Sequence, residues 1–471
     1  MRQTGNWILR DILQGTRGKL VTRELLPMNS ELVDCLRIGA ITDDTRSLQP
    51  NDLFIALKGN RYDGHEFIPL AIEKGASGII LNKGYLASLN LPSKTILITV
   101  DDTLHALGNL AHYWRDKHGH IPLIAVTGSC GKTTTKEAIS GVLQQGFKVL
   151  KNMANYNNQI GLPFTMLGLD SSYDVACVEL GTNKPGEIAY LASIARPQIG
   201  IITNIQPAHL EGFSTLKNIQ TEKGALLPHV QACFIYNADD PMVAELANSF
   251  HKSEISFGFN HGEIRAKNIV CEKEGIRFIL VLPDTHLEIK SRVLGRHQIY
   301  ALLAAAAVGH YFELTPDEIK QALETFSPLS GRLCLYQGEN GIFILDDCYN
   351  ANPASMQTAL QTLKQFSGEK IAVLGDMLEL GEKTTFWHQE VGKWAAKVPL
   401  KALIVYGTYA DDIKEGALKA GMNGNKIYPI ANKEEILSLL KKICVPGDVI
   451  LFKASHNIGF GKLVAELRGK P

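Results

Sequence analysis

The amino-acid sequence predicts an α/β protein built from three domains, and three observations support this. With 471 residues, the chain exceeds the length that one hydrophobic core usually supports. From residue 121 onward, short apolar stretches alternate with helix-length segments, the pattern of a parallel sheet covered by helices. A turn-rich linker at 327–331 precedes a second run of this alternation. We expect domains at 1–105, 106–328 and 329–471.

The apolar stretches predict the strands of each domain. In the first domain, which we expect to be a small α/β unit, they lie at 52–57, 78–81 and 95–100. In the central parallel sheet they lie at 123–127, 175–180, 199–205 and 233–237. Period-two alternation around a turn at 274–275 predicts an antiparallel hairpin within 263–294. A C-terminal Rossmann-like sheet is expected from strands at 342–345, 371–374, 402–406 and 449–452.

The composition excludes several classes of protein. The 48 basic and 48 acidic side chains cancel, which argues against a general nucleic-acid binder or a protein held on an anionic membrane. The first apolar run, 7–9, is too short for a signal peptide, and no later run has the length of a membrane span. The eight cysteines are scattered without a CxxC pair, so neither a zinc site nor a disulfide framework is indicated. We expect a soluble cytoplasmic monomer without membrane insertion.

A glycine-rich turn after the apolar run 123–127 is the strongest local motif. It consists of Gly128, Ser129, Cys130, Gly131, Lys132, Thr133 and Thr134, and a segment with helical periodicity follows. Such a turn directs backbone N–H groups and a helix N-terminus at phosphate oxygens. Lys132 would neutralise the outer phosphates and Thr133 would coordinate Mg²⁺. The order of strand, turn and helix therefore favours a nucleotide phosphate site over a chance match.

The general P-loop pattern is matched imperfectly, because Val126 stands where its first glycine is expected. A P-loop also does not distinguish kinase, switch and ligase chemistry. The rest of the chain has to make that distinction.

Beyond this loop, the sequence resembles the Mur ligase family across all three expected domains. The resemblance rests on the loop in its Thr-Gly-x-x-Gly-Lys-Thr-Thr form and on segments at 155–163, 179–183, 203–211, 223–224, 295–297, 331–333, 346–353 and 373–377. Within the family, the segments Asp-Asp-Cys-Tyr-Asn-Ala-Asn-Pro and Leu-Gly-Asp-Met-x-Glu-Leu-Gly are similar to those of the member that adds D-alanyl-D-alanine. The resemblance implies a UDP-substrate domain, a central ATPase domain and a C-terminal domain that brings in the amine.

The activity that this resemblance implies is ATP-dependent formation of an amide bond. The terminal carboxylate of a UDP-muramoyl-tripeptide would become an acyl phosphate, which the amino group of D-alanyl-D-alanine would displace. The products would be the pentapeptide precursor of peptidoglycan, ADP and phosphate. Whether the third residue of the peptide is lysine or diaminopimelate stays open, because pocket shape decides it.

The resemblance also implies roles for individual residues. Glu179 and His209 would hold Mg²⁺ together with Thr133, and Lys223 matches the lysine that the family carbamylates, which would make it a further metal ligand. Arg332 would contact the γ-phosphate, while His297 and Asp347 would contact the nucleotide. The residues implied in binding the organic substrates are Thr45, Arg46, Ser47, Asp63, Gly64, His65, Asn155, Asn158, Asn350 and Asn352.

The chain departs from the family pattern at a few positions. Gln298 and Ala301 stand where asparagines are common, which implies different adenine contacts. His456 replaces an arginine near the C-terminus, and this exchange removes a fixed bidentate charge from the amine side.

Each role has a structural alternative. Glu179 could be a solvated carboxylate at a strand end, His209 a hydrogen-bonded structural residue and Lys223 an exposed charge. Arg332 and Asp347 could pair with neighbours, and the asparagines at 155, 157 and 158 could form turns. Cys130 is expected to contribute its backbone rather than a nucleophilic thiol. The competing functions are a sibling or folylpolyglutamate-type ligase, a nucleotide switch or kinase, and an inactive nucleotide binder.

Overall fold

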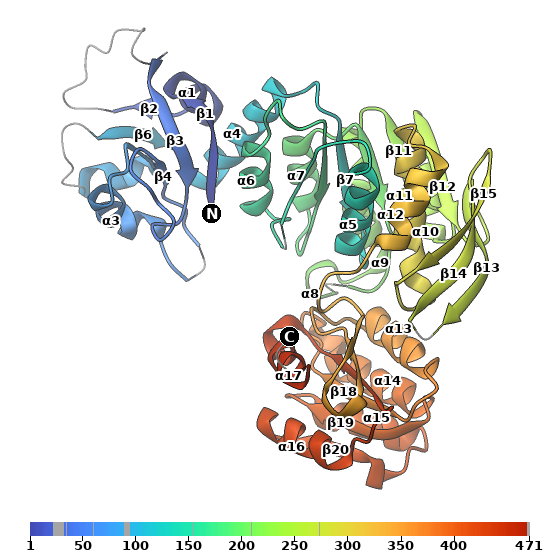
Figure 1. Cartoon of the computed structure of the whole chain (residues 1–471). Helices are drawn as coiled ribbons and strands as arrows, with labels where there is room; N and C mark the ends of the chain where they lie inside the picture. The colour runs from blue at the N-terminus through green and yellow to red at the C-terminus, as the bar shows by residue number, and fades with distance from the viewer. Residues whose placement is uncertain are drawn as a thin grey trace.

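The computed structural model describes residues 1–21, 33, 35–59, 61–88, 95–153, 155–208, 210–272 and 274–468. These residues form three sheets, each with its own helices (Figure 1). The first unit lies to one side of the central one, and the C-terminal unit lies below it in Figure 1. The predicted α/β class with three units is confirmed.

The first sheet has the strand order β1-β3-β4-β5-β6-β2. Its strands are β1 (Arg2–Ile8), β2 (Lys19–Leu20), β3 (Arg37–Thr42), β4 (Leu53–Ile55), β5 (Gly78–Asn82) and β6 (Ile96–Val100). β3 to β6 pair in parallel, while β1 and β2 pair antiparallel at the two edges. Helices α1 (Leu9–Thr16) and α3 (Ile68–Glu73) belong to this unit.

The central sheet has the order β15-β14-β13-β12-β11-β10-β7-β9-β8. Its strands are β7 (Leu123–Thr127), β8 (Val149–Lys151), β9 (Val175–Glu179), β10 (Ile199–Ile202), β11 (Cys233–Asn237), β12 (Ser253–Gly258), β13 (Ile264–Glu272), β14 (Gly275–Val281) and β15 (His286–Ser291). The strands from β8 to β13 pair in parallel, and β13, β14 and β15 form the expected antiparallel extension.

Helices cover both faces of the central sheet, as buried parallel strands require. They are α5 (Lys132–Leu143), α6 (Gly161–Leu167), α7 (Glu187–Ala195), α8 (Leu210–Phe213), α9 (Leu216–Gly224), α10 (Pro241–Ala247), α11 (Ile299–Tyr311) and α12 (Pro316–Thr325). One core contains residues of α6, α7 and α9, and the other contains residues of α5, α11 and α12.

The C-terminal sheet has the order β16-β17-β21-β18-β19-β20. Its strands are β16 (Cys334–Gln337), β17 (Phe343–Asp346), β18 (Lys370–Gly375), β19 (Leu400–Tyr406), β20 (Ile427–Ile430) and β21 (Val449–Lys453). All neighbours pair in parallel except β16 and β17. Its helices are α13 (Pro353–Lys364), α14 (Thr384–Ala396), α15 (Ala410–Lys419), α16 (Lys433–Ile443) and α17 (Phe460–Leu467).

Helix α4 (Thr103–Lys117) joins the first two units. It contacts α1 as well as α6 and α7, and the Trp7 and Trp114 rings lie 3.9 Å apart between centroids. The predicted boundary at 105/106 falls inside this helix and stays a prediction. Within the described residues, every helix falls short of the length and apolarity that crossing a bilayer requires.

Candidate functional site

The glycine-rich loop lies at the carboxyl end of β7, where an open parallel sheet places its ligands. Gly128 has φ 144° and a Cβ there would lie 2.0 Å from Thr203 Oγ1, so a side chain would collide with the next strand end. Asn204 braces the loop: its Oδ1 accepts from Cys130 N at 2.9 Å and its Nδ2 donates to Cys130 O at 3.0 Å. Asn204 thus fixes the Cys130 backbone, and its expected contact with a phosphate stays a prediction.

Lys132 folds back over the loop instead of extending into solvent. Its Nζ donates to the carbonyls of Gly128 at 2.8 Å and Ser129 at 3.3 Å. Burial lowers the pKa of Lys132, and the positive charge of Arg332 acts in the same direction, while Glu179 opposes it. The amine is therefore poised for an anion that would replace these carbonyl contacts.

Glu179 ends β9 and is 2 % exposed, so it is not a solvated surface carboxylate. Its Oε2 accepts from Thr133 Oγ1 at 2.7 Å, and its Oε1 accepts from Asn157 Nδ2 at 2.7 Å. A carboxylate and a hydroxyl in contact beside a phosphate loop are hard oxygen donors of the kind that Mg²⁺ prefers. Thr133 and Glu179 therefore fit a magnesium ion. Among the described residues, no group of three or more His, Cys, Asp or Glu side chains is arranged to bind a metal.

Asn157 is a further functional candidate, which lies in a segment that carries the family resemblance but was not predicted as a site residue. The sequence feature that could have marked it is its place in an asparagine-rich segment, two residues after Asn155. Gly181 is needed opposite it, since a Cβ there would lie 2.8 Å from the Asn157 amide carbon.

Arg332 reaches from the C-terminal unit to the phosphate loop. Its Nη2 donates to Thr133 Oγ1 at 2.9 Å, and its guanidinium lies 3.8 Å from the centroid of the Tyr349 ring. Arg332 therefore lies beside the loop, and its predicted contact with the γ-phosphate stays a prediction.

Lys223 is 2 % exposed and is therefore not a surface charge. Burial lowers its pKa well below the ordinary value of 10.5, and the positive charge of Lys132 acts in the same direction. A lowered pKa enlarges the share of the neutral amine at a given pH. His209, the other predicted metal ligand, lies outside the described residues.

Asp347 follows β17 and pairs with Lys453, which was not among the predicted site residues. Lys453, 1 % exposed, donates to Asp347 Oδ2 at 2.6 Å and to the carbonyl of Asn350 at 3.0 Å. Burial raises the pKa of Asp347, although Lys453 acts in the opposite direction. His297 lies in the short turn that precedes α11 and is exposed to solvent.

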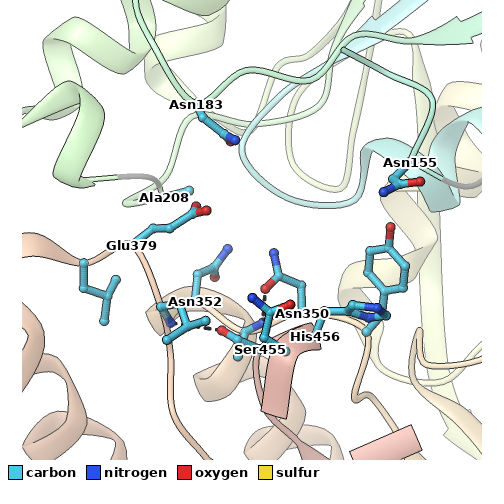
Figure 2. A pocket seen from close by; sticks show the side chains of 13 residues that line it. Asn155, Asn183, Ala208, Asn350, Asn352, Glu379, Ser455 and His456 are labelled. Atoms are coloured by element: carbon cyan, nitrogen blue, oxygen red, sulfur yellow. Dashed lines mark hydrogen bonds between the residues drawn. The ribbon is translucent and has the colours of Figure 1, made fainter. Parts of the chain in front are cut away.

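A cavity of about 520 Å³ lies between the central and C-terminal units (Figure 2). The central unit contributes Asn155, Asn183 and Ala208. The C-terminal unit contributes Tyr349, Asn350, Ala351, Asn352, Leu378, Glu379, Leu380, Ser455, His456 and Asn457. The cavity thus brings together three of the predicted substrate residues, Asn155, Asn350 and Asn352. It also includes His456, which replaces an arginine of the family pattern.

Asn158 does not line this cavity. Its Oδ1 accepts from the backbone N–H groups of Ile160 at 3.0 Å and Gly161 at 2.9 Å, where α6 begins. In this structure the Asn158 side chain forms a turn, which is the alternative to substrate binding that the sequence left open.

The predicted uridine-side residues lie in the first unit. Arg46 pairs with Asp44 at 2.8 Å and its side chain is 89 % exposed. Thr45 is buried, and its carbonyl accepts from Lys74 Nζ at 2.7 Å. Ser47 Oγ donates to Asp44 O at 3.1 Å. Among these side chains, Arg46 is the one available to an anionic ligand.

The segment of Asp63, Gly64 and His65 is held by internal hydrogen bonds. His65 Nε2 accepts from Asn82 N at 3.0 Å, so Nδ1 carries the proton that it shares with Asp63 Oδ1 at 2.6 Å. Tyr85 donates to Asp63 Oδ2 at 2.6 Å. A Cβ on Gly64 would lie 2.5 Å from Leu57 O. These residues shape the segment, and both ring nitrogens of His65 are already engaged.

Family models match most of the chain. Residues 37–115 match the model described as the catalytic domain of the Mur ligase family, and residues 126–309 match the Mur ligase middle domain. Residues 331–456 match the model described as Mur ligase, glutamate ligase domain.

Similar proteins agree with these matches. The UDP-N-acetylmuramoyl-tripeptide-D-alanyl-D-alanine ligase of Synechocystis is 37 % identical over 448 residues, which cover 93 % of this chain and 94 % of that protein. A crystal structure of MurF from Acinetobacter baumannii superposes with a TM-score of 0.88 at 29 % identity and covers 99 % of this chain and 100 % of its own. MurF from Thermotoga maritima in complex with ADP gives a TM-score of 0.82 at 28 % identity, covering 91 % and 96 %.

Proposed function

Because the chain belongs to the Mur ligase family, we propose that it joins D-alanyl-D-alanine to UDP-N-acetylmuramoyl-tripeptide with consumption of ATP. The product is the pentapeptide precursor of peptidoglycan. The observation that carries this proposal is the contact of Arg332 with Thr133, beside a cavity lined by both units. A nucleotide at the loop and an amine in the cavity would then meet at one interface.

The chemistry follows from the leaving group. A carboxylate does not react with an amine in water because oxide would have to leave, whereas phosphorylation turns that oxygen into part of a phosphate. The carboxylate oxygen attacks the γ-phosphorus of ATP, ADP leaves, and the amine then forms the C–N bond as the C–O bond to phosphate breaks. Several negative charges gather in this process, so cations have to surround the reacting groups.

The residues at the interface are suited to these tasks. Lys132 and Arg332 contribute positive charge at the loop, and the backbone N–H groups at the start of α5 face the same place. Thr133 and Glu179 would hold a magnesium ion, which supplies further positive charge to the phosphate oxygens. Lys453 orients Asp347 toward its role as an acceptor for the ribose.

The functional test is a product assay. The purified protein is incubated with ATP, UDP-muramoyl-tripeptide and D-alanyl-D-alanine, and released phosphate and product mass are measured. Phosphate release should require both peptide substrates. Nucleotide hydrolysis that is indifferent to them would contradict the ligase function and favour a switch, and a phosphorylated product would favour a kinase. Peptides with lysine or diaminopimelate at the third position, supplied in competition, identify the preferred substrate.

Lys223 is proposed to carry a carbamate. Burial lowers the pKa of this amine and so favours its neutral form, which can add CO₂ and lose a proton to give an anionic group able to help hold Mg²⁺. Native mass spectrometry in bicarbonate should show the added CO₂ and its loss in Lys223→Ala. Short carboxylic acids should restore part of the lost activity. An unmodified lysine in an active, bicarbonate-supplied sample would contradict the proposal.

The cytoplasm is the proposed compartment, because ATP and a UDP-linked substrate are needed together. A monomer is proposed as the active form, since the cavity is lined by two units of one chain. Sedimentation velocity in the presence of substrates tests whether the active form is a monomer.

A further inference from the structure

The charge of the cavity between the central and C-terminal units is carried by few residues. Glu379 is the single acidic residue among the described residues that line it, and His456 is the one potential cation. The remaining lining combines amide side chains with aliphatic ones, including Ala208, Ala351 and Leu380. A small, zwitterionic peptide with methyl side chains is complementary to such a lining, because its ammonium group needs a carboxylate partner.

The cavity adjoins the phosphate loop. Asn352 lines the cavity, and its Nδ2 lies 3.1 Å from Cys130 Sγ in the loop. A group bound in the cavity is therefore close to the place where phosphate would be transferred.

The backbone around Glu379 is held in an uncommon conformation. Glu379 has φ 64°, a left-handed value that non-glycine residues rarely adopt. Hydrogen bonds on both sides maintain it: Leu378 N donates to Ser455 Oγ at 3.0 Å, and Glu379 O accepts from Glu211 N of the central unit at 3.3 Å. Figure 2 shows the Glu379 side chain extending into the cavity, with its carboxylate directed toward the side of Asn183 and Ala208.

We propose that Glu379 binds the ammonium group of the incoming dipeptide and accepts one of its protons before attack. The proton passes from nitrogen to the Glu379 carboxylate, which frees the nitrogen lone pair. That pair forms the bond to the acyl-phosphate carbon while the C–O bond breaks and phosphate leaves. The second proton passes from the nitrogen to the departing phosphate as the amide forms. This inference rests on the proposed ligase function.

The test compares Glu379→Gln with Glu382→Gln, an exposed position in the same loop that does not line the cavity. Two amines are supplied in turn with ATP and UDP-muramoyl-tripeptide: D-alanyl-D-alanine, and hydroxylamine, which is small and uncharged near neutral pH. Hydroxylamine captures the acyl phosphate as a hydroxamate without needing a partner for an ammonium group. Unchanged melting temperatures establish that the variants fold.

We expect Glu379→Gln to raise KM for D-alanyl-D-alanine more than about tenfold, because a charged hydrogen bond is replaced by a neutral one. Hydroxamate formation should stay within about twofold of the parent protein, and Glu382→Gln should resemble the parent in both reactions. The kcat/KM of Glu379→Gln should also keep rising with pH until the dipeptide ammonium deprotonates by itself. Glu379→Asp should recover part of the affinity.

The outcomes separate this inference from the proposed function. Parent protein that forms neither pentapeptide nor hydroxamate would refute the ligase function. Parent protein that forms both, with Glu379→Gln unchanged toward D-alanyl-D-alanine, would refute the role of Glu379 alone. Equal loss of both reactions in Glu379→Gln would also refute it, because a partner of the ammonium group cannot affect a neutral amine in this way.

Discussion

Lys132 has carbonyl partners where a phosphate would be bound. Its Nζ contacts the carbonyls of Gly128 and Ser129, which are weak substitutes for phosphate oxygens. We expect Lys132→Ala to lower the rate of ATP-driven ligation at least about 100-fold, because it removes positive charge at the transferred phosphate. The fold should stay intact. Phosphate release and circular dichroism measure the two effects. Retained activity in a folded variant would refute the role of Lys132.

Asp63 has a pKa that hydrogen bonding determines. Burial acts to raise this pKa, but hydrogen bonds from Tyr85 and His65 outweigh it and lower the value from 3.8 to about 2. Because the folded-state pKa is depressed, the carboxylate stabilises the fold above pH 3.8, and this contribution is lost as the pH falls toward about 2.

Asp63→Asn should therefore flatten the acid dependence of unfolding between these pH values. The difference should be about 1–2 kcal/mol, measured by denaturant unfolding at several pH values. Glu73→Gln, at an exposed position of the same unit, is the control and should leave the acid dependence unchanged. If the free energy of unfolding of Asp63→Asn falls with pH in parallel with that of the parent protein, the hydrogen bonds do not depend on the charge of Asp63.

The end of β9 is held by Asn152, which is fully buried. Its Oδ1 accepts from Glu179 N at 2.9 Å, and its Nδ2 donates to Glu179 O at 3.0 Å and Tyr156 O at 2.9 Å. One side chain thus joins the strand end that bears Glu179 to the loop that bears Asn157. Lys136 Nζ donates to Asn152 O at 2.5 Å and completes the connection to α5.

Asn152→Ala should lower the free energy of unfolding by about 2–3 kcal/mol, because buried backbone groups lose their partners. It should also raise the Mg²⁺ concentration needed for half-maximal phosphate release, since Glu179 is no longer fixed. Chemical denaturation and a magnesium titration measure these effects. Asn248→Ala, at the exposed end of α10, serves as the control. Normal magnesium dependence in a destabilised Asn152→Ala would limit this residue to stability.

Three of the strands that the sequence did not predict share a reason, whereas β3 and β12 were also missed although they lie inside their sheets. β8, β16 and β20 lie at sheet edges and are only partly buried, so their composition is mixed. Interior strands such as β7 and β11 are fully or almost fully buried, and their apolar runs predicted their bounds correctly. The predicted strand at 199–205 ends earlier, at Ile202, because Thr203 and Asn204 turn toward the phosphate loop and bond to Cys130.

The arrangement of the units brings the reacting partners together. Arg332 lies beyond the predicted linker yet contacts the loop 199 residues earlier in the chain. Its stacking on Tyr349 keeps the guanidinium in place. Movement of the C-terminal unit would remove this positive charge from the loop, so we propose that closure of this unit is part of catalysis.

Arg332→Lys should lower kcat by more than about tenfold, because a lysine cannot reproduce the planar, stacked contact. ADP affinity, measured by calorimetry, should change much less, since the loop itself is intact. Arg292→Lys, an exposed change on the central unit, is the control. A normal kcat for Arg332→Lys would mean that any positive charge suffices at this position.

The order of motifs along the chain was enough to predict the α/β units, the phosphate loop and the family resemblance, because these depend on local periodicity and on residue types at short spacing. Sequence could not reveal that Asn157 binds Glu179, that Lys453 pairs with Asp347, or that Glu379 faces Asn183 across a cavity. Each of these contacts joins segments far apart in the chain or depends on the direction of one side chain. Packing of the three units fixes such directions, and periodicity carries no information about them.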